Sequence, residues 1–113
     1  MTSKRQLHRR SLSLAKLDEM IEEAIVDAYG ESEQIVGFFT LLEERLKLPF
    51  KTEVLGVEVT VERLHMTDDE QIVAVCSRGK RKQPLPILDL PLPDPPPDGA
   101  EWIEAFRRWA RGR

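Results

Sequence analysis

Three groups of acidic side chains are the residues in this sequence best suited to chemistry. They are Asp27, Glu31 and Glu33; Glu43 and Glu44; and Asp68, Asp69 and Glu70. Calcium prefers about six to eight oxygen ligands, largely carboxylates and carbonyls, so each group is a candidate cation site. None matches an EF-hand loop, because DAYGESEQIVGF has its glycine at the fourth position and apolar residues where ligands belong. Acids in helix first turns and hairpin turns also serve as caps or solvated charge, so spacing alone leaves both interpretations open.

Residues for catalysis are sparse. His8 lies in a basic tail and His65 near a turn, and neither has an obvious Ser or Cys nucleophile beside it in the sequence. Cys76 lies within a β-rich run, which favours a buried structural thiol. As the single cysteine, it excludes both a disulfide framework and Cys-based zinc patterns. The sequence therefore predicts a protein that is not an enzyme.

The interhelix acids must be positioned by two helices. Apolar residues recur at spacings of three and four from Leu14 to Ala28, which predicts an amphipathic helix. Gly30 is predicted to end that helix, because glycine adopts the left-handed conformation without steric cost. A second helix is predicted from about Ser32, its N-cap, as far as Pro49. Asp27, Glu31 and Glu33 would then lie at a tight turn between antiparallel or steeply crossed helices.

The third acidic group must be positioned by a sheet. Residues 50–64 alternate apolar and polar side chains, which indicates strands. The sequence TDDE (67–70) is typical of a hairpin turn, QIVAVCSRG (71–79) is a β-rich run, and Ile87 to Leu90 are predicted to pair as a short edge strand. Strands after a helical pair predict an α+β fold with a small antiparallel SH3-like barrel or curled sheet.

The length of 113 residues predicts a single domain. Its predicted parts are a disordered basic tail (1–11), the helical pair (12–48), the β barrel (50–90), a Pro-rich linker (91–98) and a C-terminal helix (99–111). The last helix carries an apolar and aromatic stripe from Trp102 to Ala110, so it is expected to dock on the body of the domain.

Charge is segregated along the chain, although the net charge is only −3. Residues 1–10 hold four cations and no acid, residues 11–50 hold three cations and nine acids, and RGKRK (78–82) forms a smaller basic cluster. With a pI near 5.4 and no evident stacking platform, nucleic acid is an unlikely partner. No run approaches the roughly 20 apolar residues that span a bilayer, so the sequence predicts no membrane partner and a cytoplasmic location.

The order of motifs resembles the calcium-binding protein family typified by a small acidic cyanobacterial calcium-binding protein (CcbP-like). The matching elements are Asp27-Ala28-Tyr29-Gly30, Glu33-Gln34, Phe38-Phe39, Leu46-Lys47-Leu48-Pro49-Phe50, LPILDLPL (85–92) and WIEAFRRWARG (102–112). The resemblance runs in order from about Leu14 to Gly112 and is strongest over residues 25–50. It implies N-terminal helices, a compact barrel-like antiparallel sheet and a C-terminal helix.

The resemblance also implies a non-enzymatic buffer or sensor that binds calcium through carboxylates outside an EF-hand. This chain carries only MTDDEQ where the family has a longer, acid-dense loop, and its next hairpin is more basic. The predicted calcium ligands are first Asp68, Asp69 and Glu70, and second Asp27, Glu31 and Glu33. The alternative is an SH3-like interaction module that has lost calcium and binds protein or nucleic acid through its basic segments.

Overall fold

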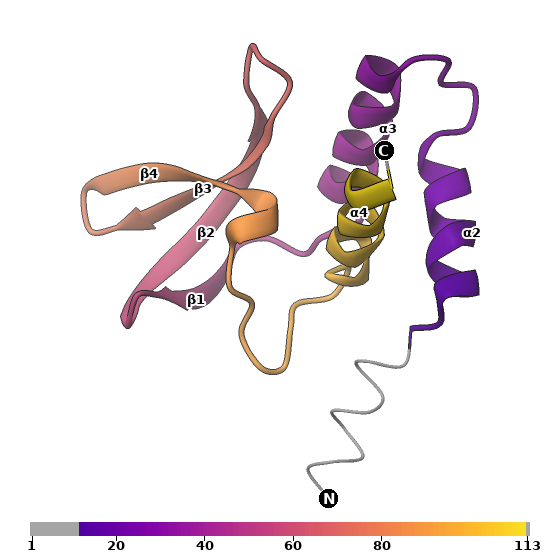
Figure 1. Cartoon of the computed structure of the whole chain (residues 1–113). Coiled ribbons are helices and arrows are strands. Elements are labelled where there is room, and N and C mark those ends of the chain that lie inside the picture. The colour runs from indigo at the N-terminus through magenta and orange to yellow at the C-terminus, as the bar shows by residue number, and fades with distance from the viewer. Residues whose placement is uncertain (1–11, 113) are drawn as a thin grey trace, which may run out of the picture.

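The computed structural model describes residues 12–112, and the predicted disordered tail (1–11) lies outside the described residues. Its elements in chain order are α2 (Leu14–Ala24), α3 (Glu31–Arg45), β1 (Phe50–Val54), β2 (Val57–Met66), β3 (Ile72–Arg78), β4 (Arg81–Pro86), the 3₁₀ turn η1 (Ile87–Asp89) and α4 (Glu101–Gly112). The helices gather on one side of the molecule and the strands on the other (Figure 1). The predicted α+β class is confirmed.

Aromatic side chains dock the C-terminal helix, as its stripe predicted. The ring centroid of Phe38 on α3 lies 5.2 Å from that of Phe106 and 5.4 Å from that of Trp109, both on α4. The Trp109 indole nitrogen donates a 2.9 Å hydrogen bond to the Gln34 side-chain oxygen. On the neighbouring helix, Asp18 of α2 accepts a 2.8 Å hydrogen bond from the Arg108 guanidinium. Helix α4 therefore contacts both α2 and α3 through specific side chains.

The turn between α2 and α3 differs from the prediction. Helix α2 ends at Ala24, and the residue with positive φ is Asp27 (62°), whereas Gly30 has a φ of −134° and is the N-cap of α3. Ser32 lies inside α3 rather than at its cap. Aspartate tolerates the left-handed conformation because its short polar side chain can form local hydrogen bonds. Gly30 is thus the start of the second helix and not the end of the first.

The sheet is an antiparallel meander in the order β1-β2-β3-β4. Among the described residues, β1 and β4 are both edges, so the sheet is open and a closed SH3-like barrel is not confirmed. A bulge between Val61 and Arg63 interrupts the pairing of β2 with β3, and such bulges increase local twist. The strands follow the predicted order but do not close on themselves.

The edge strand was predicted in the wrong place. Residues 81–86 form β4, whereas Ile87 to Asp89 form η1. Pro84 lies opposite Val75 and Pro86 opposite Val73. Counting back from the two-residue turn at 79–80, both prolines occupy non-hydrogen-bonded positions, where their nitrogens face the outer edge. A strand edge tolerates proline there, and the missing N–H groups also block pairing with another strand.

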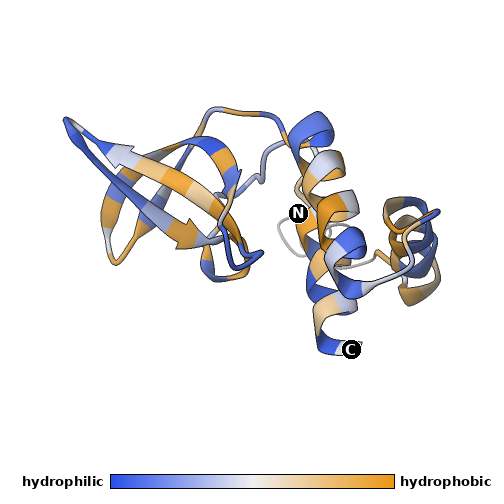
Figure 2. Cartoon of the chain, turned by 90° about the horizontal axis from the view of Figure 1, so that it is seen from above, coloured by the Kyte–Doolittle hydropathy of each residue, from blue (hydrophilic) through white to orange (hydrophobic). Residues whose placement is uncertain are grey.

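The proline-rich segment at 91–98 runs along the domain rather than away from it. The buried hydroxyl of Thr52 donates a 2.7 Å hydrogen bond to the Pro91 carbonyl, and the Lys47 amide donates a 2.8 Å bond to the Asp98 carbonyl. One hydrophobic core joins helices, η1 and sheet, and Figure 2 shows apolar positions on all of them. Its largest fully buried side chains are Phe38, Leu42, Ile87, Ile103 and Val61.

Candidate functional site

A groove of about 330 Å³ lies at the turn between α2 and α3. Its lining residues are Ala24, Val26, Asp27, Ala28, Ser32, Glu33, Val36 and Gly37. Two of the three predicted acids of this cluster therefore share one groove, and the Ser32 hydroxyl lies with them. The third, Glu31, is exposed in the first turn of α3 and does not line the groove.

The local chain path explains how the two carboxylates reach this groove. One oxygen of Glu33 accepts a 3.0 Å hydrogen bond from the Tyr29 amide, which satisfies a backbone donor before α3 as in a capping box. The positive φ of Asp27 reverses the chain just after α2. The two helices pack closely beside the groove, since a Cβ at Gly37 would lie 2.1 Å from the Ala24 carbonyl oxygen. Sequence reasoning missed this role of Gly37.

The charged side chains that line the groove, Asp27 and Glu33, are both acidic. Ala24, the last residue of α2, lines the groove, and the last turn of α2 holds no basic residue. The carboxyl end of a helix carries a partial negative charge, which adds to the charge of the Asp27 and Glu33 side chains. The amino end of α3 opposes this field, and Glu31 and Glu33 in its first turn offset that positive end.

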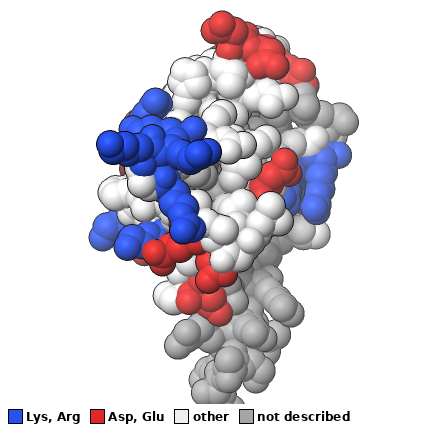
Figure 3. Space-filling model, turned by 90° about the vertical axis from the view of Figure 1, so that its left-hand side faces the viewer, with Lys and Arg blue, Asp and Glu red and all other residues white. Residues whose placement is uncertain are grey.

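The second acidic group forms the predicted hairpin turn between β2 and β3. Asp68, Asp69 and Glu70 are all exposed there, and Figure 3 shows acidic side chains gathered at the top of the molecule. The Thr67 hydroxyl donates to the Asp69 carboxylate, and the Gln71 amide donates a 3.0 Å hydrogen bond to the Thr67 hydroxyl. At least one of these carboxylates therefore has a role in the turn itself.

No three His, Cys, Asp or Glu side chains within residues 12–112 converge closely enough to hold a metal ion by themselves. Glu43 and Glu44 are exposed on α3. Any cation at either acidic group would accordingly need further oxygens from hydroxyls, backbone carbonyls or water, all of which calcium accepts.

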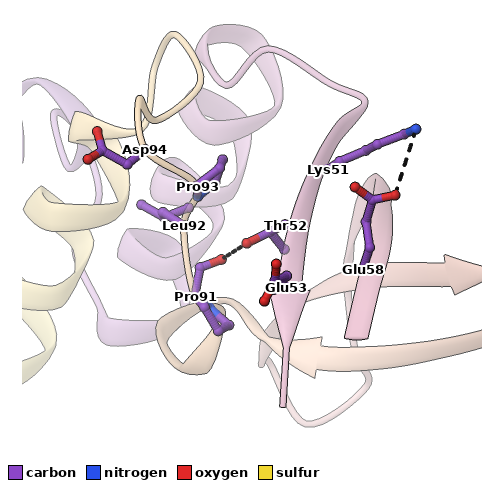
Figure 4. Close-up of a pocket in the computed structure, with 8 residues that line it drawn as sticks. All are labelled: Lys51, Thr52, Glu53, Glu58, Pro91, Leu92, Pro93 and Asp94. Atoms are coloured by element: carbon purple, nitrogen blue, oxygen red, sulfur yellow. Dashed lines mark hydrogen bonds and ion pairs between the residues drawn. The ribbon is translucent and has the colours of Figure 1, made fainter. Parts of the chain in front are cut away.

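A second groove, of about 320 Å³, lies between the edge of β1 and the proline-rich segment. It contains the acids Glu53, Glu58 and Asp94, but Figure 4 shows Asp94 directed away from the other two. The Lys51 ammonium lies 4.0 Å from the Glu58 carboxylate. Glu53 and Glu58 are cross-strand partners in the β1–β2 register, and Lys51 offsets part of their charge. The groove was not predicted because it depends on where residues 91–94 lie beside β1.

Four of the described groups, Asp18, Arg108, Glu62 and Cys76, have shifted pKa values, and all lie outside both grooves. The hydrogen bond from Arg108 lowers the pKa of Asp18, and hydrogen bonds from Ser77 and then Lys82 lower that of Glu62. Burial raises the pKa of the Cys76 thiol, as expected for a structural cysteine. These shifts reflect surface pairing and burial.

A family model described as calcium binding, of the CcbP type, matches residues 18–110. The chain belongs to this family. The match includes both the groove acids and the hairpin acids, and it confirms the predicted resemblance and calcium as the family ligand. No curated protein and no solved structure gives a significant match to the chain. In the part of the chain that the structure describes, no helix has the length and apolar character needed to cross a bilayer.

Proposed function

We propose that this CcbP-family protein is a cytoplasmic calcium buffer or sensor, without enzymatic activity, whose ion binds in the α2–α3 groove outside any EF-hand. The observation that carries the assignment to the groove is that Asp27 and Glu33 both line one cavity, within the calcium-binding match. The hairpin acids, in contrast, line neither groove.

The donor atoms of the groove fit calcium in type. The Asp27 and Glu33 carboxylates and the Ser32 hydroxyl are hard oxygen ligands. They supply fewer than the roughly six to eight oxygens that calcium takes, so water and backbone carbonyls of the turn would complete the shell. With two carboxylates, the expected affinity lies at the weak end of protein calcium sites, with a dissociation constant of about 10⁻⁴ to 10⁻³ M.

Binding would act through electrostatics. Calcium would relieve the repulsion between Asp27 and Glu33 and link the end of α2 to the start of α3. Because the ion binds the folded chain, it would raise the free energy of unfolding by about 2.7 kcal/mol at a hundredfold excess over the dissociation constant. Such stabilisation is the physical basis of a sensor, while simple uptake of the ion suffices for a buffer.

Calorimetric titration with calcium separates the two acidic groups. We expect wild-type heat at millimolar calcium to disappear in Asp27→Asn/Glu33→Gln. The heat should persist in Asp68→Asn/Asp69→Asn, which removes two charges from the hairpin. A third double variant, Glu43→Gln/Glu44→Gln, removes the same charge from the exposed face of α3 and should titrate like the wild type.

Each contrary result has a distinct meaning. If the wild type releases or absorbs no heat at millimolar calcium, the proposal of calcium binding is refuted. Loss of heat in the hairpin variant alone would assign the ion to Asp68 and Asp69 and refute the groove. The alternative of an SH3-like module that has lost calcium is not favoured, because the family match is to calcium binding and the sheet is open.

A further inference from the structure

The tip of the β1–β2 hairpin is apolar and strained. Its four residues are Val54, Leu55, Gly56 and Val57, and Leu55 is 99% exposed. Leu55 and Gly56 have φ values of 53° and 77°, the backbone of a type I′ turn that favours Asn-Gly. A leucine gains nothing from this conformation, and its side chain contributes nothing to the core. Neither turn chemistry nor packing explains why a large apolar residue occupies this tip.

A cationic hairpin lies at the same end of the sheet. In a four-stranded meander the first and third turns share one end, and Figure 1 shows the β1–β2 and β3–β4 turns together there. The β3–β4 turn carries Arg78, Lys80 and Arg81, all exposed, and none has an acidic partner among the described residues. Figure 3 shows Lys and Arg side chains gathered over this end.

The remaining charges nearby nearly cancel. Lys82 lies 3.0 Å from the Glu62 carboxylate and Lys51 lies 4.0 Å from that of Glu58, while Glu53 is the remaining acid. Five cations against three acids leave the strands and turns at this end with a net charge of two positive, although the whole chain carries −3. Asp94 of the proline-rich segment lines the groove with Lys51, Glu53 and Glu58 and lowers this value to one positive.

We infer that the end of the sheet formed by the β1–β2 and β3–β4 turns docks on an anionic lipid surface. Leu55 enters the headgroup region, and Arg78, Lys80 and Arg81 contact the lipid phosphates and carboxylates. A bilayer accepts a protruding apolar tip without a complementary pocket and attracts nearby cations. A nucleic acid would use the cations but not the leucine, because an aliphatic side chain offers a base no aromatic or guanidinium plane on which to stack.

The inference is independent of the calcium site, which lies among the helices. It also revises the expectation of no membrane partner, because that expectation rested on the lack of a spanning segment. Attachment through one apolar side chain and three cations is reversible, since stable anchoring requires stronger combined signals.

Co-sedimentation with phosphatidylcholine vesicles, with and without phosphatidylserine, tests the inference. A chelator in the buffer excludes bridging by calcium. We expect binding only to the phosphatidylserine vesicles, weakened about tenfold by Leu55→Asn. The triple variant Arg78→Gln/Lys80→Gln/Arg81→Gln should lose about a hundredfold. Asparagine suits the type I′ turn, so Leu55→Asn should fold at least as stably as the wild type in urea denaturation.

A charge-matched control separates this end of the sheet from general charge. Lys16, Lys47 and Arg111 are exposed cations outside the sheet, and their triple change to Gln removes the same charge. This control should bind the vesicles like the wild type. A loss of binding equal to that of the Arg78, Lys80 and Arg81 triple variant would overturn the assignment of the surface. The inference is also wrong if the wild type binds vesicles with phosphatidylserine no better than vesicles of phosphatidylcholine alone. Equal binding to polyglutamate or DNA with no effect of Leu55→Asn would identify an acidic macromolecule instead of a membrane.

Discussion

Replacing Gly37 by alanine tests the contact that brings α2 and α3 together. An alanine Cβ at this position would lie 2.1 Å from the Ala24 carbonyl oxygen and 3.2 Å from the carbonyl carbon. Both atoms belong to the backbone, so no flexible side chain can move aside. The end of α2 must shift away from α3, and the α2–α3 groove, which both residues line, must change shape with it.

The expected magnitude is the difference between two effects. Glycine to alanine within a helix stabilises by about 1 kcal/mol through propensity alone. Overpacking a tight contact costs about 1–3 kcal/mol, and the upper end applies because the clash is with backbone. The net loss in the free energy of unfolding is therefore about 2 kcal/mol. For a chain of this size, each kcal/mol corresponds to roughly 4 °C in Tm, so the midpoint should fall by about 8 °C.

The assay is urea and thermal unfolding, followed by circular dichroism and tryptophan fluorescence. Gly112→Ala is the matched control, because Gly112 also lies in a helix but its Cβ would meet no atom within 4 Å. That variant should be as stable as the wild type or slightly more so. Gly37→Ala should also weaken calcium binding in the calorimetric titration. If Gly37→Ala matches or exceeds the wild type in stability, α2 and α3 do not pack as described.

Three further changes test other parts of the structure. Since Arg108 lowers the pKa of Asp18, this ion pair stabilises the fold above the ordinary carboxyl pKa, and the contribution is lost as pH falls through the lowered value. Asp18→Asn should accordingly be less stable than the wild type near neutrality, with the gap closing in acid when urea midpoints are compared. Thr52→Val should cost about 1 kcal/mol by removing the buried bond to Pro91, whereas Thr52→Ser should retain it in the same denaturation assay. Because burial raises the pKa of the Cys76 thiol, it should react slowly with a chromogenic disulfide reagent until urea unfolds the chain.

The elements of the fold were largely readable from the sequence. Spacings of three and four marked α2 and α3, alternation marked β1 and β2, and the apolar stripe of α4 predicted its docking. These features are local, because a helix or strand with one buried face repeats its apolar residues at its own period. The family resemblance depended on the order of short motifs along the chain, and it was confirmed by the match over residues 18–110.

The predictions that needed tertiary knowledge were the ones that failed or stayed incomplete. The edge strand was predicted at Ile87 to Leu90, yet it lies at 81–86, where Pro84 and Pro86 occupy outward positions that only the register with β3 reveals. Gly30 appeared to be the helix stop, while the left-handed residue is Asp27. Neither register nor the angle between two helices leaves a periodic signal in a single sequence.

The candidate site likewise has features that the sequence determines and features that only the tertiary structure determines. The sequence by itself determined that carboxylates are concentrated around the start of α3 and between β2 and β3, since acids favour helix first turns and hairpin turns. Only the tertiary structure decided that Asp27 and Glu33 share a groove while Glu31 faces solvent. The cause is the close approach of α2 to Gly37, a contact between segments that no spacing along the chain specifies.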